Sequence, residues 1–196
     1  MDGSPARHVP VELEGVDQPA VLTMVRTVDT VGVETESVSA DCRRDRFAGT
    51  RATGVAVERL GVGSESVTLR DGMRRGLYGC DNTAGAREEN RRWCGGSYGE
   101  LFDGRLRDPR LDLGCVTSDG KPVGFAWVEP SPGTRYVAVQ QPGFTEVYEV
   151  ADGLPVRVAT TSGVRVEGSS AVFDLSEHDA DGRLLRRYRL EAHVAG

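Results

Sequence analysis

The pattern of apolar and polar residues predicts strands along almost the whole chain. Short runs rich in β-branched residues alternate with turns that contain Gly, Pro or Asp, which is typical of an all-β protein. Helical periodicity is almost absent. We predict strands over residues 21–25, 31–39, 53–58, 66–70, 76–80, 125–128, 136–139, 145–150, 156–160, 171–175 and 183–194.

The last predicted strand shows the clearest alternation. At period two, Tyr188 and Ala192 share an apolar face, whereas Arg187 lies on a polar face. Arg186 interrupts the apolar face, and we place it at an edge. The Asp-Gly pair that ends at Gly182 predicts a hairpin turn before this strand, since Gly adopts positive φ readily.

These strands predict an antiparallel β-sandwich, built either as one sandwich or as two small β units. We expect a flexible N-terminal segment over 1–18 and an N-terminal β domain over 19–117. Residues 118–196 form a C-terminal β-meander domain or the second half of a single sandwich. The segment 81–114 has few strand formers and many charges, so we expect a loop region there, with up to two turns of helix over 86–93.

Four cysteines, Cys42, Cys80, Cys94 and Cys115, lie too far apart for the short paired spacing of a structural zinc site. We therefore predict two disulfides, which indicate an oxidising compartment, and we favour Cys80–Cys94 and Cys42–Cys115. Four buried thiols in a cytosolic protein are the alternative. With the first pairing, the loop region would be bridged.

The segment 76–80, Gly-Leu-Tyr-Gly-Cys, resembles the F strand of immunoglobulin-like domains, in which a Tyr stands two residues before a Cys. The predicted strand at 66–70 lies where that family has its E strand. The resemblance covers residues 66–80 only, and no Trp stands at the strand C position of the family. It implies a β-sandwich, and it implies Cys42 as a competing partner for Cys80.

Charge and hydropathy exclude several classes of protein. With 24 Lys+Arg against 30 Asp+Glu, the net charge is −6, which argues against a nucleic-acid binder. No apolar run reaches the ~18 residues of a transmembrane helix. The N-terminus is polar and shows no signal peptide, so the chain is cytosolic or a mature region; the disulfides favour an extracellular or cell-surface location. Almost all basic residues are Arg, which indicates a GC-rich, bacterial genome.

The loop region holds the candidate binding residues Trp93, Tyr98, Phe102, Arg91 and Arg92. Aromatic residues and Arg are enriched where proteins bind partners, and a bridged loop would hold them in place. The alternative is that the aromatics cap the β core and the arginines pair with nearby acids. We predict a secreted or cell-surface module that binds a protein or glycan, without catalysis. A structural envelope or wall-associated domain is the second reading.

A serine hydrolase is the third reading, because Gly95-Gly96-Ser97-Tyr98-Gly99 fits the G-x-S-x-G nucleophile elbow. That motif requires a strand before the Ser and a helix after it, and neither is predicted here. The acidic turn around His178 could bind Ca²⁺ weakly, but we predict a plain polar turn in which an Asp bonds to its own backbone. We predict no metal and no cofactor.

Overall fold

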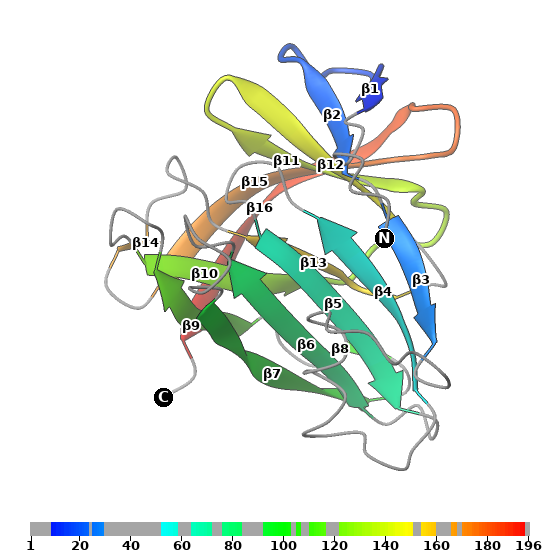
Figure 1. Cartoon of the computed structure of the whole chain (residues 1–196). Coiled ribbons are helices and arrows are strands. Elements are labelled where there is room, and N and C mark those ends of the chain that lie inside the picture. The colour runs from blue at the N-terminus through cyan, green and yellow to red at the C-terminus, as the bar shows by residue number, and fades with distance from the viewer. Residues whose placement is uncertain are drawn as a thin grey trace.

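A computed structural model describes twelve segments of the chain. They are residues 9–23, 25–29, 52–58, 64–71, 76–83, 92–102, 105–106, 110–116, 122–150, 154–159, 166–167 and 170–194. Side chains are described for 10–22, 124–150, 154–158 and 170–193. The described part is rich in strands and contains no helix, as the alternating sequence pattern predicts (Figure 1).

Sixteen strands make up this part of the chain. They are β1 (Val9–Val11), β2 (Ala20–Thr23), β3 (Val25–Asp29), β4 (Ala52–Glu58), β5 (Ser64–Asp71), β6 (Gly76–Thr83), β7 (Arg92–Phe102), β8 (Arg105–Leu106), β9 (Arg110–Val116), β10 (Pro122–Val128), β11 (Tyr136–Gln141), β12 (Phe144–Glu149), β13 (Val156–Ala159), β14 (Val166–Glu167), β15 (Ser170–His178) and β16 (Leu184–Val194).

Ten strands form one mixed sheet, in the order β1-β2-β12-β11-β15-β16-β9-β10-β13, with β14 paired to β15. Most neighbours are antiparallel, but β2 runs parallel to β12 and β9 runs parallel to β16. The prediction of a purely antiparallel arrangement is therefore wrong for this sheet. The two parallel pairs arise from long-range pairing, because a parallel neighbour needs a long connection and cannot come from a hairpin.

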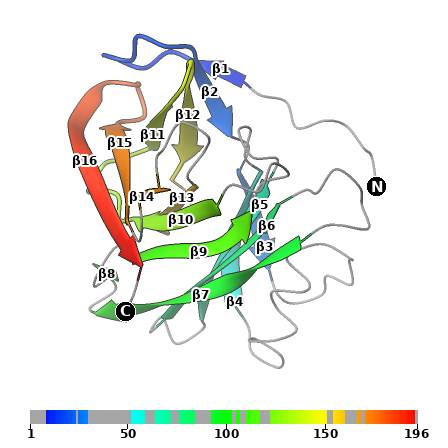
Figure 2. The same ribbon diagram turned by 90° about the vertical axis from the view of Figure 1, so that its left-hand side faces the viewer.

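The other six strands, β3 to β8, follow one another in chain order as an antiparallel meander. Figure 2 shows this sheet on one side of the molecule and β11, β12, β15 and β16 on the other. The two sheets meet where β13 contacts β5 and where β7 contacts β9. The ten-stranded sheet takes strands from both sides of residue 117, and the division into 1–18, 19–117 and 118–196 stays a prediction.

The main hydrophobic core lies on one face of the ten-stranded sheet. Val139 of β11 and Phe173 of β15 are completely buried there, and Ala126 of β10 and Val158 of β13 pack into the same cluster. Strands from the middle of the sheet and from its β13 end thus share one core, so the sheet curves around this cluster. We call this the core face, and burial of such side chains supplies the main stabilisation.

The opposite, outer face of the sheet is partly covered by residues 12–18, which we call the strap. Leu13 of the strap packs with Ala20, Ala138 and Val147 in a second buried cluster. The strap is tied to the hairpin between β15 and β16, because the Glu14 amide donates a 2.9 Å hydrogen bond to the Gly182 carbonyl. Both faces of the sheet are therefore covered around β11 and β15.

The hairpin between β15 and β16 agrees with its sequence pattern. Gly182 has a φ of 77°, the positive value predicted for the Asp-Gly turn. The Asp179 carboxylate accepts hydrogen bonds of 2.9 Å from the amides of Asp181 and Arg183, which is the local backbone bonding predicted for this acidic turn.

Candidate functional site

A polar hollow of about 190 Å³ opens on the outer face of the ten-stranded sheet, beside the strap. Its floor is built from side chains of neighbouring strands, because the register of the sheet puts Ala138 of β11 opposite Ser176 of β15. The polar residues around it are Asp17, Gln140, Thr145, Asp174, Ser176 and Arg187.

The strap forms a fixed wall of this hollow. The Arg187 guanidinium donates to the Gly15 carbonyl, and the Leu184 amide donates a 3.0 Å hydrogen bond to the Glu14 carboxylate. With its amide oriented to satisfy both neighbours, Gln18 donates to the carbonyls of Gln141 and Phe144 at 2.9 Å each. The wall is thus held by bonds at both of its ends.

Charges of both signs surround the hollow. Asp174 forms a 3.0 Å ion pair with Arg189 of β16. The Arg187 guanidinium is bonded to the Gly15 carbonyl of the strap. Within the described part of the chain, the side chains of Asp17, Gln140 and Thr145 have no hydrogen-bonding partner. These three side chains are therefore available to a ligand.

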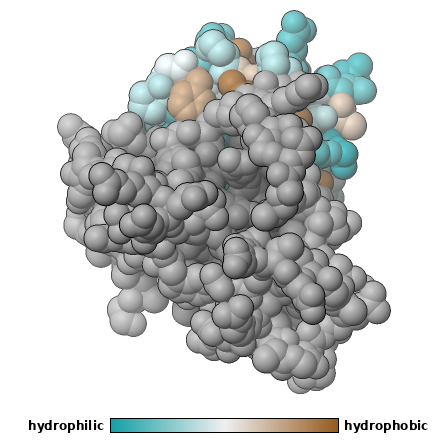
Figure 3. Space-filling model, in the orientation of Figure 1, coloured by the Kyte–Doolittle hydropathy of each residue, from teal (hydrophilic) through white to brown (hydrophobic). Residues whose placement is uncertain are grey.

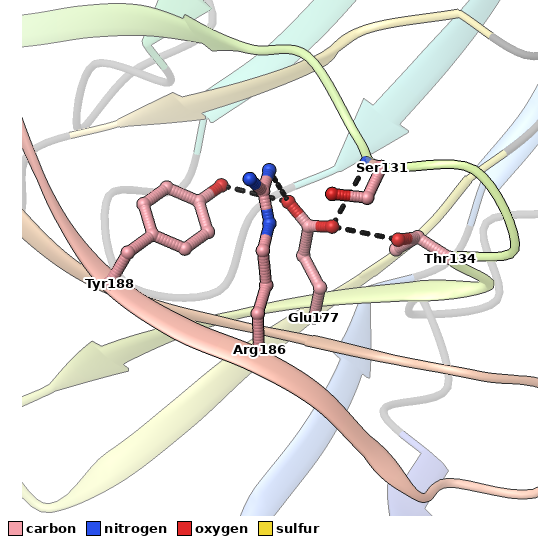
Figure 4. Close-up of polar contacts among 5 residues, drawn as sticks. All are labelled: Ser131, Thr134, Glu177, Arg186 and Tyr188. Atoms are coloured by element: carbon pink, nitrogen blue, oxygen red, sulfur yellow. Dashed lines mark hydrogen bonds and ion pairs between the residues drawn. The ribbon is translucent and has the colours of Figure 1, made fainter.

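A buried carboxylate lies on the core face behind the same strands (Figure 4). Glu177 is fully buried, and one of its oxygens accepts a 2.9 Å hydrogen bond from the Ser131 amide and a 2.7 Å bond from the Thr134 hydroxyl. The other oxygen accepts a 3.0 Å bond from the Tyr188 hydroxyl and binds the Arg186 guanidinium. Four donors thus satisfy one charge, as burial of a carboxylate requires.

This environment fixes the protonation of Glu177. Burial raises the pKa of Glu177, but hydrogen bonds from Arg186, Ser131 and Thr134 outweigh burial and lower it to about 2. Burial and the nearby Glu177 charge raise the pKa of Tyr188. Arg186 also lies over the Tyr188 ring, 4.4 Å from its centroid. The group is therefore a charged, closed network that ties the loop before β11 to β15 and β16.

Ser176 and His178 lie next to each other on the outer side of β15. Their side chains are 2.9 Å apart (Ser176 Oγ to His178 Nε2), and His178 Nδ1 lies 3.2 Å from the Gly182 carbonyl. Since a carbonyl can only accept, we assign the imidazole proton to Nδ1, and the Ser176 hydroxyl then donates to Nε2. Burial lowers the pKa of His178, which favours the neutral ring. This bonding connects β15 to its hairpin.

Four of the five predicted binding residues lie in β7, namely Arg92, Trp93, Tyr98 and Phe102, whereas Arg91 lies outside the described residues. The segment 92–102 is thus a paired strand, and the prediction of a loop there is wrong. Trp93 stands opposite Asn82 and Tyr98 opposite Tyr78 of β6. The helix predicted over 86–93 falls outside the described residues except for its last two, which are in β7.

The strand β7 also contains Ser97, which stands opposite Gly79 in the middle of the ladder. A nucleophile elbow needs a sharp turn between a strand and a helix. A serine inside a regular antiparallel ladder lacks this context, so the elbow interpretation of the G-x-S-x-G motif is wrong.

Three of the cysteines lie in described strands. Cys80 of β6 stands opposite Gly96 of β7, and Cys94 is two residues before Gly96 on that strand. Cys115 of β9 stands opposite Val123, and Cys42 lies outside the described residues. The two disulfides stay a prediction.

The residues of the hollow were not found from the sequence. Asp17, Gln140 and Arg187 come from distant segments, and no motif connects them. In the described part of the chain, no group of three or more His, Cys, Asp or Glu residues is placed to hold a metal ion. Nor does this part contain a helix with the length and apolar character needed to cross a membrane.

Comparison of the chain with protein families, curated proteins and solved structures finds no match.

Proposed function

We propose that this chain is a β-sandwich module of a secreted or cell-surface protein, which binds a protein or glycan partner and catalyses no reaction. Contacts of β13 with β5 and of β7 with β9 support a sandwich of the two sheets. The observation that carries the proposal is the polar hollow on the outer face of the ten-stranded sheet. It combines a rigid floor with side chains that have no partner of their own in the described part of the chain.

The hollow is suited to recognition because its parts are already in place. Its floor belongs to four paired strands, β12, β11, β15 and β16, and the strap wall is anchored through Arg187 and Glu14. A preorganised site loses little conformational entropy when a ligand binds, so a small number of hydrogen bonds gives useful affinity. The described residues that are visible in Figure 3 are mainly hydrophilic, which suits a polar partner.

The strand β7 is our candidate for a second contact region. It brings Arg92, Trp93, Tyr98 and Phe102 onto one strand, and such residues dominate the binding energy of many interfaces. A partner larger than the hollow could use both regions.

Secretion follows from the predicted disulfides. The proximity in register of Cys80 and Cys94 on neighbouring strands supports the first of them. Intact mass of protein made in an oxidising compartment tests this directly. Two disulfides predict a loss of four hydrogens relative to the reduced chain, whereas four free thiols would contradict the extracellular location.

Two other functions remain to be separated from binding. A structural envelope or wall-associated domain would use its surface for assembly and would bind no ligand in the hollow. A hydrolase would need a reactive serine, and the Ser–His contact of the described part is Ser176–His178. We assign this contact a structural role, because the imidazole is fully buried and bonded at both nitrogens.

The test uses the full chain, fluorescently labelled, on a printed glycan array and on a phage-displayed peptide library. We expect saturable binding in at least one of the two, weakened by Gln140→Ala. Asp181→Asn, at the exposed hairpin tip, is the matched control and should bind like the wild type. No saturable binding in either arm, or binding that Gln140→Ala leaves unchanged, would overturn the proposal. Hydrolysis of a nitrophenyl ester that Ser176→Ala abolishes would overturn the non-catalytic part.

A further inference from the structure

The geometry points to a neutral, hydroxyl-rich ring as the ligand of the hollow: one monosaccharide unit, free or at the end of a glycan. This inference rests on the proposed binding function and narrows it to one chemical class. It follows from the size of the hollow, from the mixture of charges around it and from the shape of its floor.

The size of the hollow limits the ligand to a single ring or a single side chain. Its volume is about 190 Å³. Pockets for drug-sized ligands usually have volumes of roughly 300–1,000 Å³. A nucleotide or a folded peptide would therefore not fit, but the terminal residue of a longer molecule could enter while the rest stays in solvent.

The charges around the hollow give a charged ligand of either sign repulsion as well as attraction. Asp17 and Asp174 would repel an anion, and Arg187 would repel a cation. A neutral ligand avoids both penalties. A hydroxyl group both donates and accepts, so a ring with several hydroxyls can bond to carboxylates and to donor groups at the same time.

The side chains that have no partner supply the matching hydrogen bonds. Gln140 offers an amide that donates and accepts, Asp17 offers a carboxylate that accepts, and Thr145 offers a hydroxyl that does both. Gln140 of β11 and Thr145 of β12 stand directly opposite each other in the sheet, whereas Asp17 comes from the strap, so a ligand meets polar groups of both the floor and the wall. Such convergence gives specificity for a hydroxyl pattern rather than for one isolated group.

The floor of the hollow is shallow and partly apolar. Ala138 and Ser176 have small, buried side chains, and Val16 of the strap adds an apolar edge. Small floor residues leave room for a flat ring, and the apolar edge can contact the C–H groups of a sugar. A lysine or arginine side chain would gain less from this surface, because its charge would remain near Arg187.

Isothermal titration of the full chain tests the inference with free monosaccharides: glucose, galactose, mannose and N-acetylglucosamine. Inorganic phosphate and lysine methyl ester serve as charged probes. We expect saturable binding of at least one sugar and none of either charged probe. Gln140→Ala and Thr145→Val should each weaken binding by about fivefold to tenfold, the effect of one lost hydrogen bond. Arg183→Ala, at the exposed hairpin, should leave the affinity unchanged.

The possible failures are distinguishable. Binding of phosphate or of the amine in place of sugars would overturn the inference. Binding of peptides alone, weakened by Gln140→Ala, would also overturn the sugar inference. The proposed binding function would then survive. If neither sugars, array glycans nor peptides bind, both proposals fail. Because Thr145 is buried, the affinity of Thr145→Val is interpreted only if its circular dichroism spectrum matches that of the wild type. Gln140 is exposed, so Gln140→Ala alone decides the test if Thr145→Val does not fold.

Discussion

Glu177 of β15 and Arg186 of β16 stand directly opposite each other in the sheet, and the Arg186 guanidinium binds the fully buried Glu177 carboxylate. This pairing explains why a charged residue interrupts the apolar face of the last strand. The Arg186 side chain is 45% exposed, so only one member of the pair is taken out of water. The Thr134 hydroxyl and the Ser131 amide also donate to Glu177. The ion pair and these two donors together hold the β10–β11 loop against β15 and β16.

Glu177→Gln should destabilise the protein by about 2–3 kcal/mol, because the buried amide cannot accept from four donors and the charge-assisted bonds are lost. Urea unfolding measures the change. Glu191→Gln is the control, since Glu191 is exposed on the next strand, and it should change the free energy of unfolding by less than about 0.5 kcal/mol. Equal changes in the free energy of unfolding for the two substitutions would show that the Glu177 network does not stabilise the fold.

Acid should remove the stabilisation by Glu177 between about pH 4.5 and pH 2. The pKa of Glu177 falls from its ordinary value of 4.5 to about 2 in the folded chain, because its hydrogen bonds outweigh burial. The unfolded chain therefore binds this proton first, and the stabilisation present above pH 4.5 is lost as the pH falls toward 2. The difference in unfolding free energy between the wild type and Glu177→Gln should shrink over this interval. A difference that stays constant with pH would contradict the assignment.

His178 should make the protein less stable as the pH falls below 6.5. Burial lowers the pKa of His178 from its ordinary value of 6.5, so the unfolded chain binds the proton at a higher pH than the folded chain. The stabilisation that comes from keeping His178 neutral is fully present above pH 6.5 and is lost as the pH falls below it. Unfolding at about pH 7.5 and about pH 5.5 measures this loss, which His178→Gln should reduce. His193→Gln, at an exposed site, should keep the full wild-type loss.

Gly182→Ala should be more harmful than Gly143→Ala, although both glycines have positive φ values, 77° and 81°. A Cβ at Gly182 would lie 2.7 Å from the Glu12 carbonyl oxygen of the strap, whereas a Cβ at Gly143 would meet nothing within 4 Å. The backbone term alone costs about 1–2 kcal/mol, and the clash adds about 1–3 kcal/mol at Gly182. Thermal or urea unfolding of both variants compares them. Equal losses would show that the strap does not pack against the hairpin.

Local patterns of the sequence predict much of the fold. Each of the predicted strands at 53–58, 66–70, 76–80, 125–128, 136–139, 145–150, 156–160, 171–175 and 183–194 overlaps a strand of the structure, although residue 160 lies outside the described residues. The predicted strand at 21–25 is divided between β2 and β3, which belong to different sheets. The predicted strand at 31–39 lies outside the described residues.

The strand β7 was missed because three glycines, at 95, 96 and 99, weaken its strand propensity. Tertiary pairing with β6 overrides that local preference. The parallel pairing of β2 with β12 has no local signal at all, since the two strands are separated by most of the chain. The hollow was missed for the same reason: its walls are assembled from the strap, β11, β12, β15 and β16 only after folding.

The most direct test of the binding site is amide chemical-shift mapping of the ¹⁵N-labelled chain with the best ligand from the array or the titrations. We expect the largest shifts on the hollow, at Gly15, Gln140, Thr145 and Ser176, with small shifts at Val158 of β13, which lies at the end of the sheet. Largest shifts outside the hollow, for example confined to 92–102 in β7, would contradict this expectation.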